Sequence, residues 1–410
     1  MEFVVQSELS MRKQFETLRH KLAQNKIINL FARNLFFKKY VSIPEEGKRF
    51  LFVRFDITNK CNLRCVMCSY SLDETNIKNP AIYMDTHLFG KIAKQVFPYA
   101  HAVSLSCSFE PLLHKQLADF LKIIDFYKVP VWGFVTNALL LNEEMIENII
   151  KYNVPIITVS IDGATKETYE KIRLGANFEK FITNIRKIIE LKKRYNVNHP
   201  KLYYNYVLMK SNIEELPDFI NLAKGLDAEF ITLVHIFPRN KLNPEYLGNH
   251  KELFNNYMSK AKEIIEKHKI PCSHPELFRL ENIDEDLSYQ SHYDNAEKNV
   301  GARSPRPEEC EKINSDEDAI KDNTLNPDFK CFAPYFIMHI NSGGEVFPCS
   351  SRLVNKPYGD FKKQNFFEIW NSVKYLRLRK GLKTKKLFGQ CKHCEPFTED
   401  EIDRSDKLIS

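Results

Sequence analysis

Alternating apolar segments divide the middle of the chain into predicted strands and helices. Apolar runs of strand length lie at residues 51–57, 102–105, 131–135, 156–161, 202–209 and 230–236. Segments with helical spacing of apolar residues lie at 85–97, 115–126, 143–152, 169–194 and from 212 onward. This alternation predicts an α/β fold of repeated βα units around a parallel sheet. Six units are too few for a closed eight-stranded barrel, so we expect a partial (β/α)6 barrel.

The periodic pattern ends after Pro238, and the rest of the chain is organised differently. Residues 251–268 keep a helical spacing, whereas residues 275–330 are acidic and aperiodic, which is typical of a linker or a mobile cover. Apolar runs at 336–340 and 345–347 flank a glycine-containing turn and predict a β-hairpin. We expect four parts: an N-terminal helical extension at 1–48, the partial barrel at 49–240, a helix and acidic linker or lid at 241–330, and a small domain at 331–410.

The N-terminal extension is basic and amphipathic. Between Arg12 and Lys39 eight Lys or Arg residues stand against one acid, Glu16, with apolar residues interleaved. Such helices either contact a membrane surface or an anionic ligand, or pack their apolar face on the main domain; we favour packing and keep peripheral membrane contact as the alternative. No apolar stretch has the length of a signal-peptide core or a membrane span.

Composition narrows the class of protein. The chain has 410 residues, ten Cys and a net charge of +7, which suits one large α/β domain and a smaller one. Cysteines clustered by threes and twos without a signal peptide indicate metal binding in a reducing compartment, so we expect a cytoplasmic protein. The basic N-terminal segment has no accompanying nucleic-acid-binding signature, and we expect no nucleic-acid partner.

The run Cys61-Asn62-Leu63-Arg64-Cys65-Val66-Met67-Cys68 carries the strongest chemical signal. Three thiolates at this spacing let one short loop wrap around a cuboidal four-iron cluster, and they leave one iron without a protein ligand. Structural zinc requires four protein ligands, and the nearest following histidine is His87, well outside the loop. The run therefore predicts an iron–sulfur cluster with an open iron.

This cysteine run resembles the cluster-binding loop of the radical S-adenosylmethionine (radical SAM) enzymes. The resemblance implies their TIM-like partial barrel, a [4Fe-4S] cluster held by Cys61, Cys65 and Cys68, and S-adenosylmethionine on the open iron. In that family one electron from the cluster cleaves S-adenosylmethionine to a 5'-deoxyadenosyl radical, which abstracts a hydrogen atom from the substrate. A flavodoxin- or ferredoxin-type protein is the implied electron donor.

Further segments occupy the places of the family's cofactor motifs. Ser108-Phe109-Glu110-Pro111 stands where the family has Gly-Gly-Glu-Pro, with Ser and Phe replacing the glycines. In similar enzymes a serine and a following arginine at these places hold the carboxylate of the cofactor, which implies this role for Ser160 and Arg173; a guanidinium suits the two oxygens of a carboxylate. A surface salt bridge on a helix is the alternative for Arg173. The resemblance implies these cofactor-binding residues: Met67, Ser108, Glu110, Asn137, Ser160 and Arg173.

Cys107 and His235 are the candidate catalytic residues. Cys107 directly precedes Ser108, where a thiol beside the cofactor is placed to donate a hydrogen atom to a substrate radical; a small residue in a buried turn is the favoured alternative. His235 on the last strand, with Tyr204 and Asn205 on the strand before it, is a candidate substrate contact at the mouth of the barrel. Neighbouring residues of a strand face opposite sides, so Tyr204 and Asn205 cannot both face inward.

A second set of cysteines lies near the C-terminus: Cys331, Cys349, Cys391 and Cys394. Four thiolates suit either zinc or an iron–sulfur cluster. Their spacing, with the segment Phe366-Phe367-Glu368-Ile369-Trp370-Asn371 between them, resembles the SPASM or twitch auxiliary-cluster domain of radical SAM enzymes. The resemblance implies one auxiliary [4Fe-4S] cluster, fully ligated by these four residues, for residues 331–410.

These resemblances imply a radical SAM oxidoreductase or maturase. One auxiliary cluster and a short N-terminus are similar to the small-molecule members of the family. We therefore expect dehydrogenation or epimerisation of a carbohydrate-like or other small natural-product substrate. The alternatives are a radical SAM maturase that modifies a peptide or protein and, from another class, a non-catalytic iron–sulfur binding protein.

Overall fold

The computed structural model describes residues 49–72, 74–106, 108–236, 243–280, 331, 333–349 and 356–383. From Leu51 onward the chain forms one compact unit. None of the helices in these ranges has the length and hydropathy to cross a membrane. The expected N-terminal extension, the acidic linker and three candidate residues, Cys107, Cys391 and Cys394, lie outside the described residues, as do the expected domain boundaries at 240 and 330.

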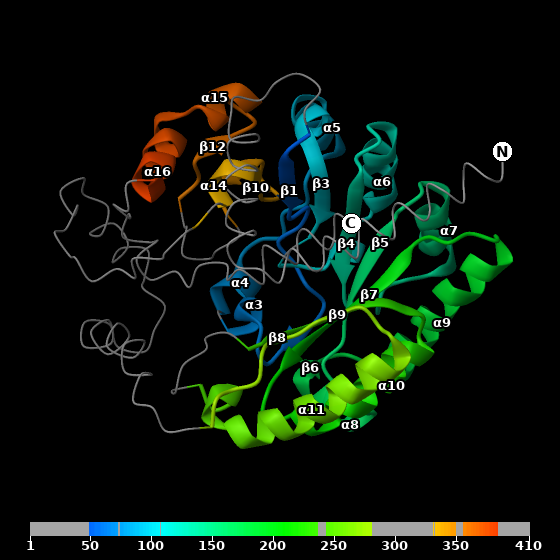
Figure 1. Cartoon of the computed structure of the whole chain (residues 1–410). Coiled ribbons are helices and arrows are strands. Elements are labelled where there is room, and N and C mark those ends of the chain that lie inside the picture. Colours follow the sequence, from blue (N-terminus) through cyan, green and yellow to red (C-terminus); the bar gives the residue numbers. More distant parts are fainter. Residues whose placement is uncertain are drawn as a thin grey trace, which may run out of the picture. The chain divides into compact units, whose positions relative to one another are not determined.

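A ten-stranded sheet organises this unit, in the order β12-β11-β10-β1-β3-β4-β5-β7-β8-β9 (Figure 1). The six central strands pair in parallel, which confirms the predicted α/β fold with six βα strands. Their bounds are β1 Leu51–Phe55, β3 Ala100–Leu105, β4 Val131–Thr136, β5 Ile156–Ser160, β7 Lys201–Leu208 and β8 Ala228–His235. The remaining strands of the sheet are β9 Cys272–Ser273, β10 Ile337–Ile340, β11 Glu345–Phe347 and β12 Gly359–Asp360, while β2 Arg64–Cys65 pairs separately with β6 Arg173–Leu174.

Helices cover one face of the central strands. Phe55 of β1 packs on Phe89 of α5 with ring centroids 4.9 Å apart, and Tyr206 of β7 packs on Phe219 of α10 at 4.4 Å. The helices of the central part are α3 Ser69–Leu72, α4 Glu74–Lys78, α5 Thr86–Val96, α6 Leu117–Phe126, α7 Glu143–Lys151, α8 Lys166–Ile172, α9 Phe178–Arg194, α10 Leu216–Gly225 and α11 Lys251–His268. The C-terminal helices are α14 Ala333–Phe336, α15 Phe366–Trp370 and α16 Val373–Lys383.

Burial alternates along the central strands and identifies their two faces. Leu51, Val53 and Phe55 of β1 are buried against helices, whereas Phe52 and Arg54 on the other side are partly exposed. Successive side chains of a strand point to opposite faces, so this alternation means that only one face is fully packed. We call the other face, which carries Phe52 and Arg54, the inner face of the sheet.

The prediction of one long helix at 169–194 is wrong, because two helices occupy this range. α8 ends at Ile172 and α9 begins at Phe178. Between them Arg173 and Leu174 form β6, and Gly175 has a φ of +88°, a conformation that favours glycine. Apolar spacing continues across the break, so periodicity alone gave no sign of it. The break takes Arg173 off a helix surface and pairs it with the cysteine loop.

The predicted C-terminal hairpin exists as β10 and β11, and it belongs to the main sheet. β10 pairs in parallel with β1, with Phe52 opposite Ile337 and Arg54 opposite His339. Figure 1 shows β10 next to β1. The helices α14, α15 and α16, coloured yellow to orange, lie on the same side of β1 as β10. We call the described residues between 331 and 383 the auxiliary region. This region is therefore joined by backbone hydrogen bonds to β1, the strand that leads into the cysteine loop.

Candidate functional site

The cysteine loop begins six residues after β1 and is tied to the sheet by its backbone. The N–H of Glu110 donates to the carbonyl of Lys60 at 3.0 Å, and the N–H of Val66 donates to that of Ile172 at 2.9 Å. β2 pairs antiparallel with β6, which places Cys65 opposite Arg173. Segments that follow β1, β3 and β5 thus meet at the loop, at the edge where parallel strands end.

The three loop thiols are partly or wholly buried. Burial raises the pKa of Cys61 to about 11 and also raises the pKa of Cys65, where the charge of Arg173 opposes it. Burial therefore favours the neutral thiols of Cys61 and Cys65, and a metal that binds them replaces the proton. Within the described ranges no three His, Cys, Asp or Glu side chains converge on one point as a mononuclear metal site requires. A cuboidal cluster has no such requirement, since each thiolate binds a different iron.

Arg173 and Asp162 form a buried ion pair beside the loop. Nη2 of Arg173 lies 2.6 Å from Oδ2 of Asp162, with side chains 8% and 0% exposed. Oδ1 of Asp162 accepts the N–H of Val207 at 2.8 Å, and Nη1 of Arg173 lies 3.9 Å from Sγ of Cys65. Burial raises the pKa of Asp162 although Arg173 opposes the rise; burial lowers the pKa of Arg173, but Asp162 and Cys65 outweigh it.

This geometry corrects the alternative of a surface salt bridge for Arg173. The residue is 7% exposed and lies in β6 rather than on a helix. Two of its terminal nitrogens are directed at a carboxylate and at a thiol that belongs to the cysteine loop. Asp162, the second residue after β5, is its partner. Arg173 thereby places its positive charge 3.9 Å from the sulfur of Cys65.

Glu110 is buried at the junction of three segments, with 2% exposure. Oε1 accepts hydrogen bonds from the hydroxyl of Thr136 at 2.7 Å and from the N–H of Leu112 at 3.1 Å. Oε2 accepts the N–H of Asn137 at 2.8 Å. Burial raises the pKa of Glu110 to about 7 despite these three donors, which lower it. Glu110 therefore fixes the end of β4 to the segment after β3.

Asn137 connects the same junction to the cysteine loop. Its Nδ2 donates to Oδ1 of Asn62 at 2.9 Å, and its Oδ1 accepts the N–H of Leu139 at 3.1 Å. The next residue, Ala138, has a φ of +62°, the left-handed conformation that glycine adopts most readily. The side-chain amide of Asn137 thus links the end of β4 to Asn62 of the cysteine loop.

Asp56 and His339 form a polar contact that the sequence did not reveal. Nε2 of His339 and Oδ2 of Asp56 lie 2.9 Å apart, with side chains 13% and 4% exposed. Oδ1 of Asp56 accepts the N–H of Ser108 at 3.1 Å. His339 belongs to β10 and Asp56 follows β1, so the contact links the auxiliary region to the Ser108 segment. The only sequence signal for this contact was an acid, Asp56, inside the apolar run 51–57.

The other candidate cofactor residues occupy separate positions near the loop. Ser160 ends β5 in register with Asn205 of β7, and Ser108 contacts Asp56 through its backbone. The side chain of Met67 packs on an apolar cluster formed by Ile172, Met209 and Ile236, with Val207 and Tyr246 at its margin. No cofactor contact of these residues is part of the structure, so their cofactor-binding roles stay predictions.

His235 lies away from the inner face of the sheet. It shares a face of β8 with the fully buried Leu233, and its ring lies 5.1 Å from that of Phe254 on α11 and 5.4 Å from that of Phe278. The expected position at the mouth of the barrel is therefore wrong, since strand alternation directs this ring toward a helix. A catalytic role for His235 has no geometric support.

Tyr204 and Asn205 divide between the faces of β7 as strand geometry requires. The hydroxyl of Tyr204 donates to the carbonyl of Leu226 at 2.8 Å, and the side chain is fully buried. Asn205 is partly exposed and pairs with Ser160 and Thr232 in the registers of β5 and β8. Asn205 is thus the inner-face residue, and Tyr204 is part of the helix-facing core.

Polar side chains recur along the inner face. They alternate with the buried helix-facing residues and are partly exposed. Cβ added to Gly133, in register with Ser104 and Ile156, would lie 2.0 Å from the carbonyl oxygen of Ile156, so the backbone closes tightly there. The inner-face polar residues of the strands are Arg54, Ser104, Thr158, Ser160, Asn205, Thr232 and His339.

The auxiliary region has two described cysteines, Cys331 and Cys349, neither of them in a disulfide bond. Cys331 precedes α14, and Cys349 lies two residues beyond β11. Around them aromatic packing dominates: Phe366 stacks with Trp370 at 5.9 Å, and Trp370 packs on Tyr375 at 5.4 Å. The thiol chemistry suits an iron–sulfur cluster or zinc, and the structure describes only half of the predicted ligand set.

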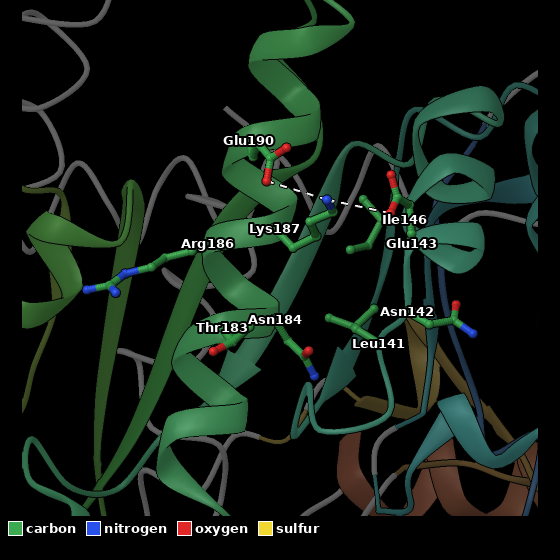
Figure 2. A pocket seen from close by; sticks show the side chains of 9 residues that line it. All are labelled: Leu141, Asn142, Glu143, Ile146, Thr183, Asn184, Arg186, Lys187 and Glu190. Carbon is green, nitrogen blue, oxygen red and sulfur yellow. Dashed lines mark ion pairs between the residues drawn. The ribbon is translucent and has the colours of Figure 1, made fainter.

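A cleft of about 470 Å³ lies outside the inner face, between the start of α7 and α9. Figure 2 shows Lys187 between Glu143 and Glu190, each with its nearest oxygen 3.5 Å from Nζ. On the floor of this region Asn184 donates to the carbonyl of Ala138 at 2.8 Å. Asn184 thus connects the cleft to Ala138, in the loop that follows β4. None of the residues that line the cleft belongs to the cysteine loop.

Two family models match the chain in the two regions that contain the cysteines. Residues 55–223 match the radical SAM superfamily, and residues 331–395 match an iron–sulfur cluster-binding domain, SPASM. The first match begins in β1 and includes the cysteine loop, Glu110 and Arg173. The second includes Cys331, Cys349, Cys391 and Cys394.

Individual relatives agree with these models. The chain is 27% identical over 219 residues to a probable GTP 3',8-cyclase of Methanocaldococcus jannaschii, covering 53% of this chain and 70% of that protein. It is 23% identical over 350 residues to an AdoMet-dependent heme synthase of Methanosarcina barkeri, covering 84% and 88%. The crystal structure of Streptococcus suis SuiB bound to S-adenosylmethionine superposes with a TM-score of 0.57 at 16% identity, covering 96% of this chain and 84% of that chain.

Proposed function

Because this chain belongs to the radical SAM superfamily and carries a SPASM iron–sulfur domain, we propose that it oxidises or epimerises a small polar substrate. A radical SAM domain carries a [4Fe-4S] cluster and S-adenosylmethionine, whose cleavage supplies the radical, and a SPASM domain carries an auxiliary cluster. In this proposal Cys61, Cys65 and Cys68 hold the first cluster. Cys331, Cys349, Cys391 and Cys394 hold the auxiliary one.

The residues around the loop fit a cluster that must be held rigidly and kept from water. Arg173 places a guanidinium 3.9 Å from Sγ of Cys65, where it stabilises the thiolate form of that ligand. Asp162 orients Arg173, and Asn137 holds Asn62 inside the loop. Glu110 fixes the two segments beneath the loop. These side chains position the ligands; Ser108 and Ser160 are the proposed contacts for the cofactor itself.

The polar inner face is the observation that supports a small hydrophilic substrate. Hydroxyl and amide groups recur on β3, β5, β7 and β8 at Ser104, Thr158, Asn205 and Thr232, and each of these residues is partly exposed. Such groups recognise a molecule that carries several hydroxyl or amide groups of its own. The names of the two relatives, probable GTP 3',8-cyclase and AdoMet-dependent heme synthase, also refer to small molecules.

The central test is anaerobic reconstitution of the full chain with iron and sulfide, followed by dithionite and S-adenosylmethionine. We expect 5'-deoxyadenosine from the parent chain and none above background from Cys65→Ala. Candidate substrates are then supplied with deuterium on carbon, as polyols, sugar phosphates, nucleotides and short peptides. Deuterium transfer into 5'-deoxyadenosine from the polar small molecules supports the proposal. Transfer from peptides alone would replace it with a peptide-modifying activity.

A pair of variants on β8 tests the inner face as the substrate surface. Thr232→Val removes one hydroxyl from that face without changing side-chain volume, whereas Glu229→Gln alters an exposed residue of the same strand. We expect Thr232→Val to raise KM about 5- to 100-fold, since one hydrogen bond to substrate contributes about 1–3 kcal/mol. Glu229→Gln should leave KM unchanged. Equal effects of the two variants would remove the inner face from consideration.

A further inference from the structure

Arg379 is held in an unusual setting on the buried side of α16. Its Cζ lies 4.1 Å from the ring centroid of Trp370 and 4.9 Å from that of Tyr375. Nε donates to the carbonyl of Pro334 at 2.9 Å, and Nη1 donates to the carbonyl of Trp370 at 2.8 Å. Two aromatic faces and two carbonyls therefore fix the guanidinium in one position.

This position lies between the two described cysteine-bearing segments. Pro334 follows Cys331 by three residues, and the hydroxyl of Tyr335 donates to the carbonyl of Arg379 at 2.8 Å. On the other side the hydroxyl of Tyr375 donates at 3.4 Å to the carbonyl of Phe347, two residues before Cys349. Two residues of α16 thus contact these segments: Arg379 contacts the Cys331 segment, and Tyr375, whose ring lies under the guanidinium of Arg379, contacts the Cys349 segment.

The electrostatic surroundings of the two tyrosines agree with this placement. Burial raises the pKa of Tyr335, Arg379 lowers it, and the thiol of Cys331 raises it further. Tyr375 is affected in the same way by burial, by Arg379 and by Cys349. Each tyrosine therefore lies within electrostatic range of Arg379 and of one cysteine. Arg379 is therefore the charge that affects both tyrosines, and each tyrosine is also affected by one of the two cysteines.

One guanidinium nitrogen of Arg379 has no hydrogen-bond partner within the described part of the chain. Nη2 is buried and makes no hydrogen bond there, although the other two guanidinium nitrogens do. A buried N–H group without an acceptor costs about 1–3 kcal/mol, and more when it is charged. Thiolate or sulfide sulfur of an iron–sulfur cluster is an acceptor of the right charge, and hydrogen bonds to sulfur raise the reduction potential of a cluster.

We propose that Arg379 is a positioning residue of the auxiliary cluster: its Nη2 group faces the cluster held by Cys331 and Cys349 and raises its reduction potential. The inference rests on the proposed ligand role of these cysteines. A fixed positive charge and a donated hydrogen bond both stabilise the cluster more after it gains an electron than before. The auxiliary cluster is thereby a better electron acceptor than the same four thiolates would make without Arg379.

The test measures the auxiliary cluster alone. The full chain with C61A, C65A and C68A is reconstituted anaerobically, and the cluster is titrated between redox states by EPR. Adding Arg379→Met, which keeps an apolar stem on the aromatic rings, should lower the equilibrium constant for one-electron reduction at least tenfold, or about 59 mV. Arg379→Lys keeps the charge and should shift the potential less. Tyr335→Phe removes a contact of α16 without touching the charge and should leave the potential unchanged.

Pulsed EPR on the chain with Arg379 intact guards against a variant that fails to fold. Arginine labelled with ¹⁵N in its guanidinium should produce a weak ¹⁵N coupling to the reduced auxiliary cluster. Absence of that coupling, or a loaded Arg379→Met cluster with the parental potential, overturns the inference and leaves the proposed function intact. A chain that takes up no iron after loss of Cys61, Cys65 and Cys68 overturns the auxiliary ligand assignment and the inference together.

Discussion

The cysteine loop and the auxiliary region are stabilised by different physical means. Around the loop the contacts are buried, charged or polar, and directional, as in the pair Arg173–Asp162 and the three hydrogen bonds of Glu110. Around Cys331 and Cys349 the contacts are mainly aromatic, among Phe366, Trp370 and Tyr375, with Arg379 as the fixed cation.

The difference indicates what each region requires. Directional hydrogen bonds fix atoms to within a fraction of an ångström, which suits a loop whose ligands must leave one iron open to a cofactor. Aromatic packing excludes water and tolerates small displacements, which suits a fully ligated cluster that only exchanges electrons. We therefore expect single polar substitutions to be costly near the loop and mild in the auxiliary region.

The largest effect is expected from Arg173→Leu. It leaves the carboxylate of Asp162 buried with only the N–H of Val207 as partner, and removal of one member of a buried pair costs about 3–5 kcal/mol. Urea unfolding of the cluster-free chain measures the loss. The double variant Arg173→Leu/Asp162→Asn removes the stranded charge and should regain part of it. If the double variant is no more stable than the single one, the ion pair is not what holds this region.

Glu110 predicts a pH dependence of stability. Its pKa of about 7 in the folded chain lies above the usual value of 4.5, so the folded chain binds the proton more tightly than the unfolded one. The resulting stability is fully present below pH 4.5 and is lost as pH rises through 7; the loss is on the order of 3 kcal/mol. Thermal unfolding from pH 5 to 8 measures it. Glu110→Gln lacks this component, so the difference between the two chains should change with pH; a constant difference would contradict the assignment.

A smaller effect is expected where the two regions meet. His339→Leu leaves Oδ2 of the buried Asp56 without its 2.9 Å partner, and the expected cost is about 1–3 kcal/mol. His339→Gln retains an N–H donor and should cost less. The same unfolding experiment compares them. Equal stability of His339→Leu and the parent would show that β10 is held by its backbone pairing with β1 alone.

The smallest effect is expected inside the auxiliary region. Tyr375→Phe removes a hydroxyl whose hydrogen bond to Phe347 is long, 3.4 Å, and keeps the ring contacts with Trp370 and Arg379. We expect a loss below about 1 kcal/mol. A loss as large as that of Arg173→Leu, measured under the same conditions, would remove the distinction between the two regions.

Sequence patterns predicted the strands well because apolar runs separated by helical spacing record burial directly. Three features named from the sequence lie together in the structure: the three loop cysteines, Glu110 of the Glu-Pro motif, and Arg173. The roles of Ser160 and of the C-terminal cysteines stay predictions. Their chemistry requires particular residue types at particular spacings, and spacing survives in a sequence. The family matches agree with what those residues implied.

Tertiary pairing is what the sequence could not provide. The helix break at Arg173 depends on the pairing of β6 with β2, and the place of His339 depends on the pairing of β10 with β1. Neither partner strand is near in sequence, so no local pattern records either contact. His235 was assigned to the mouth of the barrel because strand position was known but strand face was not; the ring contacts with Phe254 and Phe278 determine that face.

The claim that Cys61, Cys65 and Cys68 hold the incomplete cluster is tested most directly by EPR of the dithionite-reduced chain with and without S-adenosylmethionine. We predict that addition of S-adenosylmethionine changes the spectrum of the parent and of Cys349→Ala, with 5'-deoxyadenosine formed in the parent. Cys65→Ala should show neither the change nor the product. A Cys65→Ala chain that still responds to S-adenosylmethionine and cleaves it would contradict the account.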